Sequence, residues 1–576
     1  MPSSESPEPT NPDRDESTEL LRRQAVALER LVVVADPTSA PRKKFVARMI
    51  ALAVGWSGAV VGAYQFGIFV VESHAKRSMV ANWVDAAREM YEVEGSATEA
   101  GEMLSRAAEL SPENVTVRKF AAYIDGMRAV ERLVNLDRPF NRSDVEEYGR
   151  AMGQAVMLER VDPDSPDWAV LRGQLALAVG EPLRAEAFLK TALTIDPTSA
   201  FATLRLALVH WYLANAAKDP IIREREIAAC RSGIDEALRL NPQFKWALLW
   251  KGVVALEVDQ NPTAAAAAME EALALYPRFV NALNTLGNCH KIQEQWEQAE
   301  RAYARALAIR PDEVLALTDL AVVYGAQDKY EIGLRYARRA TDAAPGSLKA
   351  WTMRGLLARE LAKVSAGSEA DRDELVAEAI TAYSTALDLD PRQADAYIER
   401  SNLFRQTNNL QQAGEDARNA VLFGADDPYA WNALGKYLAD AGFHEKAAST
   451  FDKVIELDGA FDTAYLDRAR AHLAAGHRAQ GAKDLDTALQ KATEDFRAEI
   501  LLERGKFHLA GGDRELALAD FVAARKAQPE MFDAWIAEAS VFKALGRMEE
   551  AKAAALEALQ LRPGDETAKK LSEGTT

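Results

Sequence analysis

Residues 281–311, NALNTLGNCHKIQEQWEQAERAYARALAIRP, decide the fold of this chain. Leu283 and Gly287 lie four residues apart in the first half, and Ala299 begins a similar pattern in the second half. Small and large apolar residues at helical spacing predict two amphipathic helices that pack against each other as a hairpin. Pro311 closes the stretch, because proline fits the first turn of a following helix without losing a hydrogen bond.

The same arrangement recurs through the rest of the chain. Its most regular feature is a small residue in the first helix of each hairpin, which returns in steps of 34 residues within three groups. These residues are Gly287, Ala321 and Gly355, then Ser401, Gly435 and Ala469, then Gly505 and Ala539. Glycines follow where each first helix must stop and turn, at Gly442, Gly476, Gly512 and Gly546. A fixed period of this length indicates stacked helical repeats that share one elongated core.

The pattern resembles the tetratricopeptide repeat family, in which small residues let two helices touch and large ones fill the gaps between hairpins. Besides residues 281–311, the unit containing Trp431, Gly435, Ala447 and Phe451 matches the family pattern closely. The resemblance implies an all-α fold, an α-solenoid in which the hairpins form a right-handed superhelix. It also implies a concave groove, lined by the first helices, that holds an extended peptide or a helix.

The chain divides into segments of different composition. We expect a disordered tail (1–18), an amphipathic helix (19–36), a basic linker (37–44), a transmembrane helix (45–72), divergent repeat-like hairpins (76–163), the repeat array (165–563), and a capping helix with a tail (564–576). About thirteen hairpins follow from the spacing, and two inserts, near residues 214–226 and 362–375, should lengthen the helices or the turns between them.

The predicted membrane anchor rests on residues 49–71, which contain no charged side chain. At about 1.5 Å per residue, a helix of this length spans about 34 Å, enough to cross a hydrocarbon core. Four basic residues precede the span (Arg42, Lys43, Lys44 and Arg48) and two follow it (Lys76 and Arg77). This bias favours a single-pass protein of the inner membrane with a cytoplasmic N-terminus and the repeats outside the cytoplasm, and the reverse topology is the alternative.

Within the span, Gly55, Gly58 and Gly62 fall on one helical face. Small residues let two membrane helices approach closely, so this face would support a homodimer or docking on another membrane helix. Glycine is common in membrane helices in general, which leaves the background explanation equally open.

Composition argues against several classes of function. The net charge of −18 does not suit a nucleic-acid binder, which needs a basic face to neutralise phosphates. The two cysteines, Cys230 and Cys289, form neither a disulfide framework nor a zinc-site pattern. Phosphate-binding loops, nucleophile elbows and calcium loops are missing from the sequence, and the repeats occupy nearly all of the chain after the anchor. We therefore predict a protein that is not an enzyme and has no catalytic residues, metal, cofactor or small-molecule substrate.

Amides and cations recur at the positions that the family resemblance places on the groove. They are Asn281, Asn284, Asn288, Lys291, Asn402, Arg405, Asn432, Lys436, Arg470, Lys506 and Lys543. Asparagine pairs with a peptide backbone in both directions, and lysine or arginine accepts carboxylates. Solvated polar positions on exposed helices explain the same residues without a ligand.

The leading hypothesis is a membrane-anchored scaffold or adaptor whose groove binds a partner protein, as a peptide tail or a helix, and organises a complex in the bacterial envelope. Two alternatives stay open. One is a self-associating structural scaffold, and the other is an accessory subunit that presents substrates to a membrane enzyme.

Overall fold

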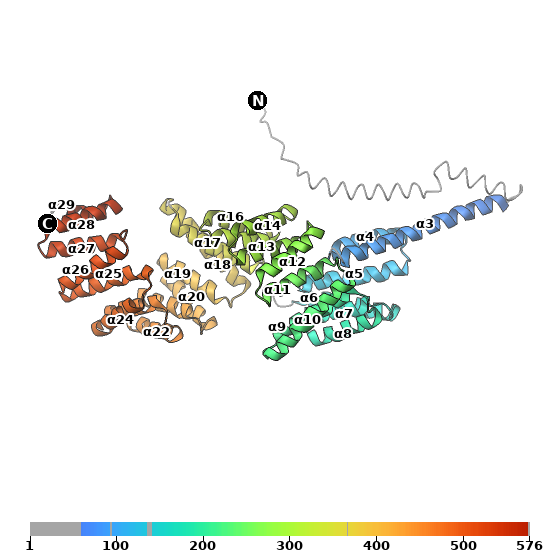
Figure 1. Cartoon of the computed structure of the whole chain (residues 1–576), viewed down its shortest axis with the longest axis horizontal. Helices are drawn as coiled ribbons and strands as arrows, with labels where there is room; N and C mark the ends of the chain where they lie inside the picture. Colours follow the sequence, from blue (N-terminus) through green and yellow to red (C-terminus); the bar gives the residue numbers. More distant parts are fainter. Residues whose placement is uncertain (1–58, 93–94, 135–140, 366, 574–576) are drawn as a thin grey trace, which may run out of the picture. The chain divides into compact units, whose positions relative to one another are not determined.

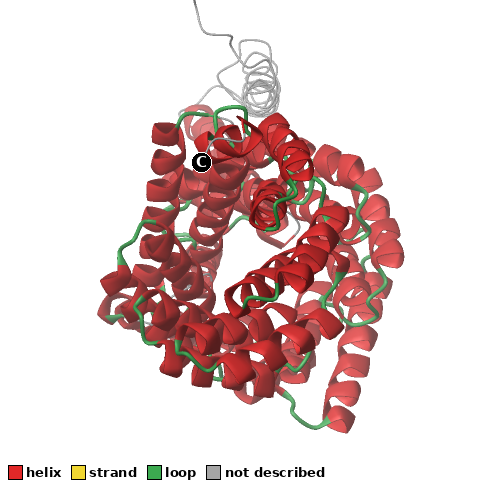
Figure 2. Cartoon of the chain, turned by 90° about the vertical axis from the view of Figure 1, so that its left-hand side faces the viewer, coloured by secondary structure: helices red, strands yellow, loops and turns green. Residues whose placement is uncertain are grey.

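The computed structural model describes residues 59–92, 95–134, 141–365 and 367–573. Within these ranges the secondary structure consists of 27 helices, α3 to α29, joined by turns, and no strand occurs (Figure 2). Twelve pairs of consecutive helices pack against each other within the described part, from α3 with α4 to α27 with α28, and α29 follows at the end. The predicted all-α repeat architecture is thus confirmed.

The chain forms two compact units, the N-terminal unit up to Glu294 and the C-terminal unit from Gln295. The N-terminal unit contains α3 (Ala59–Glu92), α4 (Ala97–Leu110), α5 (Val115–Val134), α6 (Arg142–Val161), α7 (Asp167–Ala178), α8 (Pro182–Ile195), α9 (Ala200–Ala216), α10 (Pro220–Leu240), α11 (Lys245–Glu257), α12 (Pro262–Leu275) and α13 (Val280–Ile292). Neighbouring helices such as α7 and α8 pack side by side as hairpins (Figure 1).

The C-terminal unit repeats the same construction. It contains α14 (Trp296–Ile309), α15 (Val314–Gly325), α16 (Tyr330–Ala343), α17 (Leu348–Val364), α18 (Glu369–Leu389), α19 (Ala394–Gln406), α20 (Leu410–Phe423), α21 (Pro428–Asp440), α22 (His444–Leu457), α23 (Asp462–Ala474), α24 (Arg478–Lys491), α25 (Glu494–Gly511), α26 (Arg514–Ala527), α27 (Phe532–Ala544), α28 (Met548–Leu561) and α29 (Glu566–Glu573).

The small residues of the repeat pattern lie where two helices touch. A Cβ added to Gly435 on α21 would come within 2.6 Å of the ring of Phe451 on α22. Gly505 on α25 stands in the same relation to Phe521 on α26, at 2.5 Å. Both phenylalanines are buried, so each glycine makes room for a large side chain from the second helix of its own hairpin.

The turns inside the hairpins require a left-handed backbone. The four glycines predicted to end first helices all have positive φ, from 76° at Gly546 to 91° at Gly512. In other hairpins the same conformation is adopted by Gln260, Asp328 and Asn408, with φ of 48°, 58° and 57°. The turn geometry is therefore retained even where glycine is absent, at some cost in backbone strain.

The sequence left open whether the two inserts lengthen the helices or the turns between them. In the structure they lengthen the helices. Both α9 and α17 have 17 residues, and their partners α10 and α18 have 21, against 14 in α12. The segment 564–576, for which we predict a capping helix, contains α29, and Ala568 on this helix is buried against Phe532 and Ala558 of the preceding hairpin.

The predicted tail, amphipathic helix and basic linker lie outside the described residues, as do Gly55 and Gly58. The predicted membrane span enters the described part at Ala59, and Gly62 lies in α3. None of the helices in the described part has an apolar stretch long enough to cross a bilayer, so the span at 45–72 stays a prediction. The helix does not break after the span but continues to Glu92, where Val84 and Tyr91 are buried in the core.

Candidate binding groove

A cavity of about 440 Å³ opens on the first helices of four consecutive hairpins in the C-terminal unit. Arg405 comes from α19, Lys436 from α21, Arg470 from α23 and Phe496 from α25. Three of the predicted groove cations, Arg405, Lys436 and Arg470, therefore line one cavity.

The floor of this cavity is apolar. Leu466 and Phe451 are almost fully buried, at 2% and 1% exposure, and Ala439 lies beside them in the lining. Phe496 is 38% exposed at the rim. An apolar floor with a solvent-exposed aromatic ring suits the insertion of an apolar or aromatic side chain from a partner.

Each lining cation is paired with an acid from a neighbouring first helix. The Arg405 Nε donates to Asp440 Oδ2 at 2.6 Å, and the Lys436 Nζ lies 3.6 Å from Asp467 Oδ2. These pairs join α19 to α21 and α21 to α23. The rim therefore consists of ion pairs that bridge successive hairpins, where the sequence had suggested a stripe of cations and amides.

Arg470 is the most connected of these cations. Its guanidinium lies 2.8 Å from Glu499, 3.4 Å from Glu503 and 3.5 Å from Asp467. Burial opposes the charged form, but the hydrogen bond that Arg470 donates to Glu499 and the nearby carboxylates outweigh it and raise the pKa of Arg470. The side chain stays 38% exposed, so a ligand can still reach it.

Asp467 lies deepest in the network. Burial raises the pKa of Asp467, and the nearby Lys436 and Arg470 offset this only in part. Its Oδ2 is buried and makes no hydrogen bond within the described part of the chain. The Lys436 ammonium is 3.6 Å away from this oxygen, so an N–H donor from a ligand could approach it more closely than Lys436 does.

The other predicted groove residues lie elsewhere. Asn281, Asn284, Asn288 and Lys291 are all on α13 in the N-terminal unit, where Asn284 is buried at 8% exposure and presents no surface to a partner. In the C-terminal unit, Asn402 accepts a hydrogen bond from Arg405 at 3.3 Å.

The remaining three lie outside the cavity as well. Asn432 on α21 has a buried Oδ1 without a hydrogen bond among the described residues. Lys506 on α25 pairs with Glu503 at 2.9 Å, and Lys543 lies on α27.

The acidic partners of the groove cations could have been predicted from their spacing in the sequence. Two of the three lining cations stand one residue after the small marker residue, and their acid partners stand two residues before the marker of the next hairpin. Lys436 with Asp467 and Arg470 with Glu503 follow this rule, at separations of 31 and 33 residues. A search for cation–acid pairs at this spacing would have found both.

The comparisons with known proteins agree with this construction. A family model described as tetratricopeptide repeat matches residues 280–313, and a second with the same description matches residues 364–430 and 502–566. The chain carries tetratricopeptide repeats. These matches cover hairpins at the centre and at the end of the chain, including α19, which contributes Arg405 to the cavity, and the second half of α25.

Two human proteins resemble part of the chain. Protein O-mannosyl-transferase TMTC3 of Homo sapiens is 34% identical over 162 residues, which are 28% of this chain and 16% of that protein. Tetratricopeptide repeat protein 6 of Homo sapiens is 28% identical over 156 residues, 27% of this chain and 29% of that protein. The chain thus spans less than a third of either relative.

Solved structures with some similarity include the APC/C hetero-tetramer Cut9-Hcn1, at 16% identity and a TM-score of 0.38. That match covers 92% of this chain and 98% of the other. Another is YrrB, described as a TPR protein with an unusual peptide-binding site, at 20% identity and a TM-score of 0.28. It covers 35% of this chain and 96% of the other.

Proposed function

We propose that this protein is a membrane-anchored scaffold that binds a segment of a partner protein in the cavity of the C-terminal unit. The observation that carries the proposal is the apolar floor of Phe451 and Leu466 beneath a rim of exchangeable ion pairs. A partner residue with an apolar or aromatic side chain fills the floor. Charged or amide groups next to it then exchange with the rim pairs around Arg470.

The groove proposal is tested by placing a photocrosslinking amino acid at Phe496 of the full chain and illuminating living cells. Phe496 lines the cavity and is exposed, and no hydrogen bond or ion pair depends on its side chain. We expect a discrete adduct with another protein, and its loss when Arg470→Glu reverses the charge of the rim. The matched control is Phe443, which is 51% exposed in the same unit and does not line the cavity.

The result also separates the proposal from its alternatives. Equal adducts from positions 496 and 443 would show nonspecific contact and refute a specific groove. Adducts with copies of the chain alone would favour the self-associating scaffold. A membrane enzyme as the captured protein would favour the role of an accessory subunit.

The membrane anchor is a second part of the proposal and has its own test. Residues 49–71 carry no charge, and α3 continues from this region into the first hairpin as one helix. Full-length protein should stay in the membrane pellet after alkaline carbonate extraction, and a variant lacking residues 45–72 should not. Release of the full-length chain by carbonate would refute the anchor. Protease protection in spheroplasts then decides whether the repeats lie outside the cytoplasm.

A further inference from the structure

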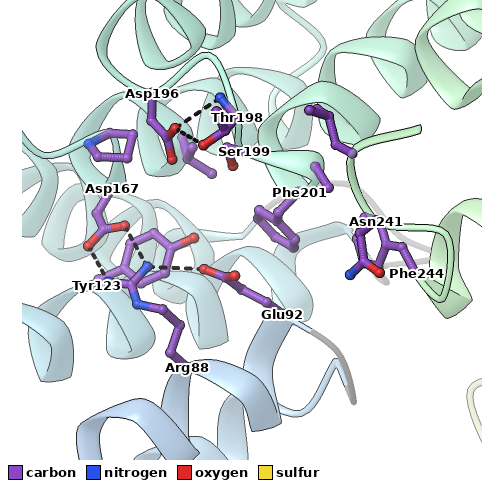
Figure 3. A pocket seen from close by; sticks show the side chains of 14 residues that line it. Arg88, Glu92, Tyr123, Asp167, Asp196, Thr198, Ser199, Phe201, Asn241 and Phe244 are labelled. Atoms are coloured by element: carbon purple, nitrogen blue, oxygen red, sulfur yellow. Dashed lines mark hydrogen bonds and ion pairs between the residues drawn. The ribbon is translucent and has the colours of Figure 1, made fainter. Parts of the chain in front are cut away.

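A second cavity, of about 340 Å³, lies in the N-terminal unit and is unlike the groove in its chemistry (Figure 3). Glu92 comes from the end of α3, Tyr123 from α5 and Asp167 from the start of α7. Asp196 enters from the turn before α9, and Phe244 from the turn before α11. Five consecutive hairpins therefore contribute to one partly open cavity.

Carboxylates outnumber cations in the lining of this cavity. Arg88 is its one guanidinium, against the carboxylates of Glu92, Asp167 and Asp196. Both Arg88 Nη atoms bind Asp167, at 3.3 and 3.2 Å, and Nη1 also binds Glu92 Oε1 at 3.0 Å. Burial, which Arg88 offsets only in part, raises the pKa of Glu92, and the charges of Asp167 and Asp196 add to the shift.

Two carboxylate oxygens in the lining accept no hydrogen bond from the described residues. Asp196 Oδ1 accepts from the backbone N–H and the hydroxyl of Thr198, at 3.0 and 2.7 Å. No hydrogen bond reaches the second oxygen of Asp196, or the Oε2 of Glu92, among the residues that the structure describes. The bidentate face of Asp167, by contrast, is occupied by Arg88.

Tyr123 gives an independent sign of a missing ligand. Its side chain is only 1% exposed, yet its hydroxyl points into the cavity and makes no hydrogen bond within the described ranges (Figure 3). The ring is fixed by contacts with the rings of Tyr91 and Phe120, at 5.8 and 5.7 Å between centroids. Because the rest of the side chain is buried, the hydroxyl can find a partner only inside the cavity, where a ligand or a water supplies the hydrogen bond.

We propose that this cavity binds a primary ammonium group, the side chain of a lysine in a partner peptide. The free oxygens of Glu92 and Asp196 and the phenol oxygen of Tyr123 are three separate acceptors, which match the three N–H donors of an ammonium. A guanidinium prefers the bidentate face of a carboxylate, and Arg88 already takes the one at Asp167. The aromatic walls formed by Phe201 and Phe244 suit the methylene stem of the lysine.

The test uses full-length protein and saturation-transfer-difference NMR with three peptides, Ser-Gly-Ser-X-Ser-Gly-Ser, where X is lysine, Nε-acetyl-lysine or norleucine. We expect transfer to the lysine methylenes and about tenfold weaker binding of the other two peptides. Asp196→Asn keeps the oxygen that holds Thr198, and Tyr123→Phe removes an oxygen that has no protein partner. Both variants should therefore fold normally, with unchanged circular dichroism, and should each weaken lysine binding about tenfold.

The control variant is Glu181→Gln, which removes an exposed carboxylate of the same unit outside the cavity. It should leave binding unchanged. Equal transfer to the lysine and norleucine peptides would overturn the proposal, and so would lysine binding that survives both cavity variants. If the natural partner of the Tyr123 hydroxyl is only a water molecule, the lysine and norleucine peptides should show equal transfer. Because Arg470→Glu affects only the groove, the two proposals fail or hold independently.

Discussion

The substitution Asp484→Ala should loosen one hairpin of the C-terminal unit. Arg468 on α23 binds both oxygens of Asp484 on α24, with Nε–Oδ2 at 2.9 Å and Nη2–Oδ1 at 2.6 Å. Its third nitrogen binds Asp452 on α22 at 2.6 Å. The guanidinium therefore ties together three helices from two consecutive hairpins.

The magnitude follows from the burial of the pair. Asp484 is 5% exposed and the Arg468 side chain 19%. Removing one partner of a buried ion pair costs about 3–5 kcal/mol, because the other charge is left uncompensated. Since Asp452 still holds Arg468, we expect a smaller loss of about 2–3 kcal/mol. This corresponds to about 30- to 150-fold more frequent opening of the hairpin.

Hydrogen–deuterium exchange of the full chain measures this directly, because each repeat opens with its own free energy. Amides in α23 and α24 should exchange faster by that factor, and amides in the N-terminal unit should not change. The control is Glu456→Ala, which breaks the exposed pair with Lys453 and should cost less than about 0.5 kcal/mol. Equal exchange in the two variants would refute the reasoning, since burial would then not set the strength of the pair.

Three further predictions concern other parts of the chain. Gly505→Ala should destabilise the protein by about 1–3 kcal/mol in urea titrations, because its Cβ would meet a buried ring at 2.5 Å, whereas Gly149→Ala, with open space around it, should be neutral or stabilising. Burial raises the pKa of Cys230 and of Cys289 to about 11, so iodoacetamide at pH 8 should alkylate both at least about 100-fold more slowly than in the unfolded chain; equal rates would contradict their burial. Burial also raises the pKa of Asp467, so the folded state loses stability as the pH rises through that pKa. At pH 7, Asp467→Asn should therefore melt at a higher temperature than the wild type. The two melting temperatures should become equal as the pH falls below about 4, where the carboxyl is protonated in both the folded and the unfolded state.

The sequence predicted the hairpins because their packing is local. Gly435 and Phe451 lie 16 residues apart, and the need for a small residue opposite a large one repeats with the period of the chain. The same repeat also placed the glycines that end the first helices with positive φ. It did not predict the turns at Asp328 and Asn408, since an ordinary side chain in a left-handed conformation has no sequence signature as clear as glycine.

The ion pairs of the groove cations were not predicted, for a different reason. A cation at a groove position looks free when one repeat is considered alone, and its acid partner belongs to the next repeat. The bidentate ion pair between Arg468 and Asp484, here called the clamp, was also missed. The same pair recurs at the same 16-residue spacing in two other hairpins, as Arg400 with Asp416 and as Arg504 with Asp520. Side-chain direction, which decides whether such a pair forms, follows from the packed hairpin and not from spacing alone.

Arg468 and Arg470 lie two residues apart on α23, yet their surroundings suit them to different tasks. Arg468 faces the second helix of its own hairpin and is 19% exposed, whereas Arg470 faces the groove and is 38% exposed. Ion pairs that water reaches contribute only about 0–1 kcal/mol each, so a partner's carboxylate can replace Glu499 beside Arg470 at little cost. Binding in the groove would then be an exchange of ion pairs in which the clamp of Arg468 stays closed. Such exchange predicts that raising the salt concentration weakens the adduct at position 496 while hydrogen exchange in α23 stays unchanged.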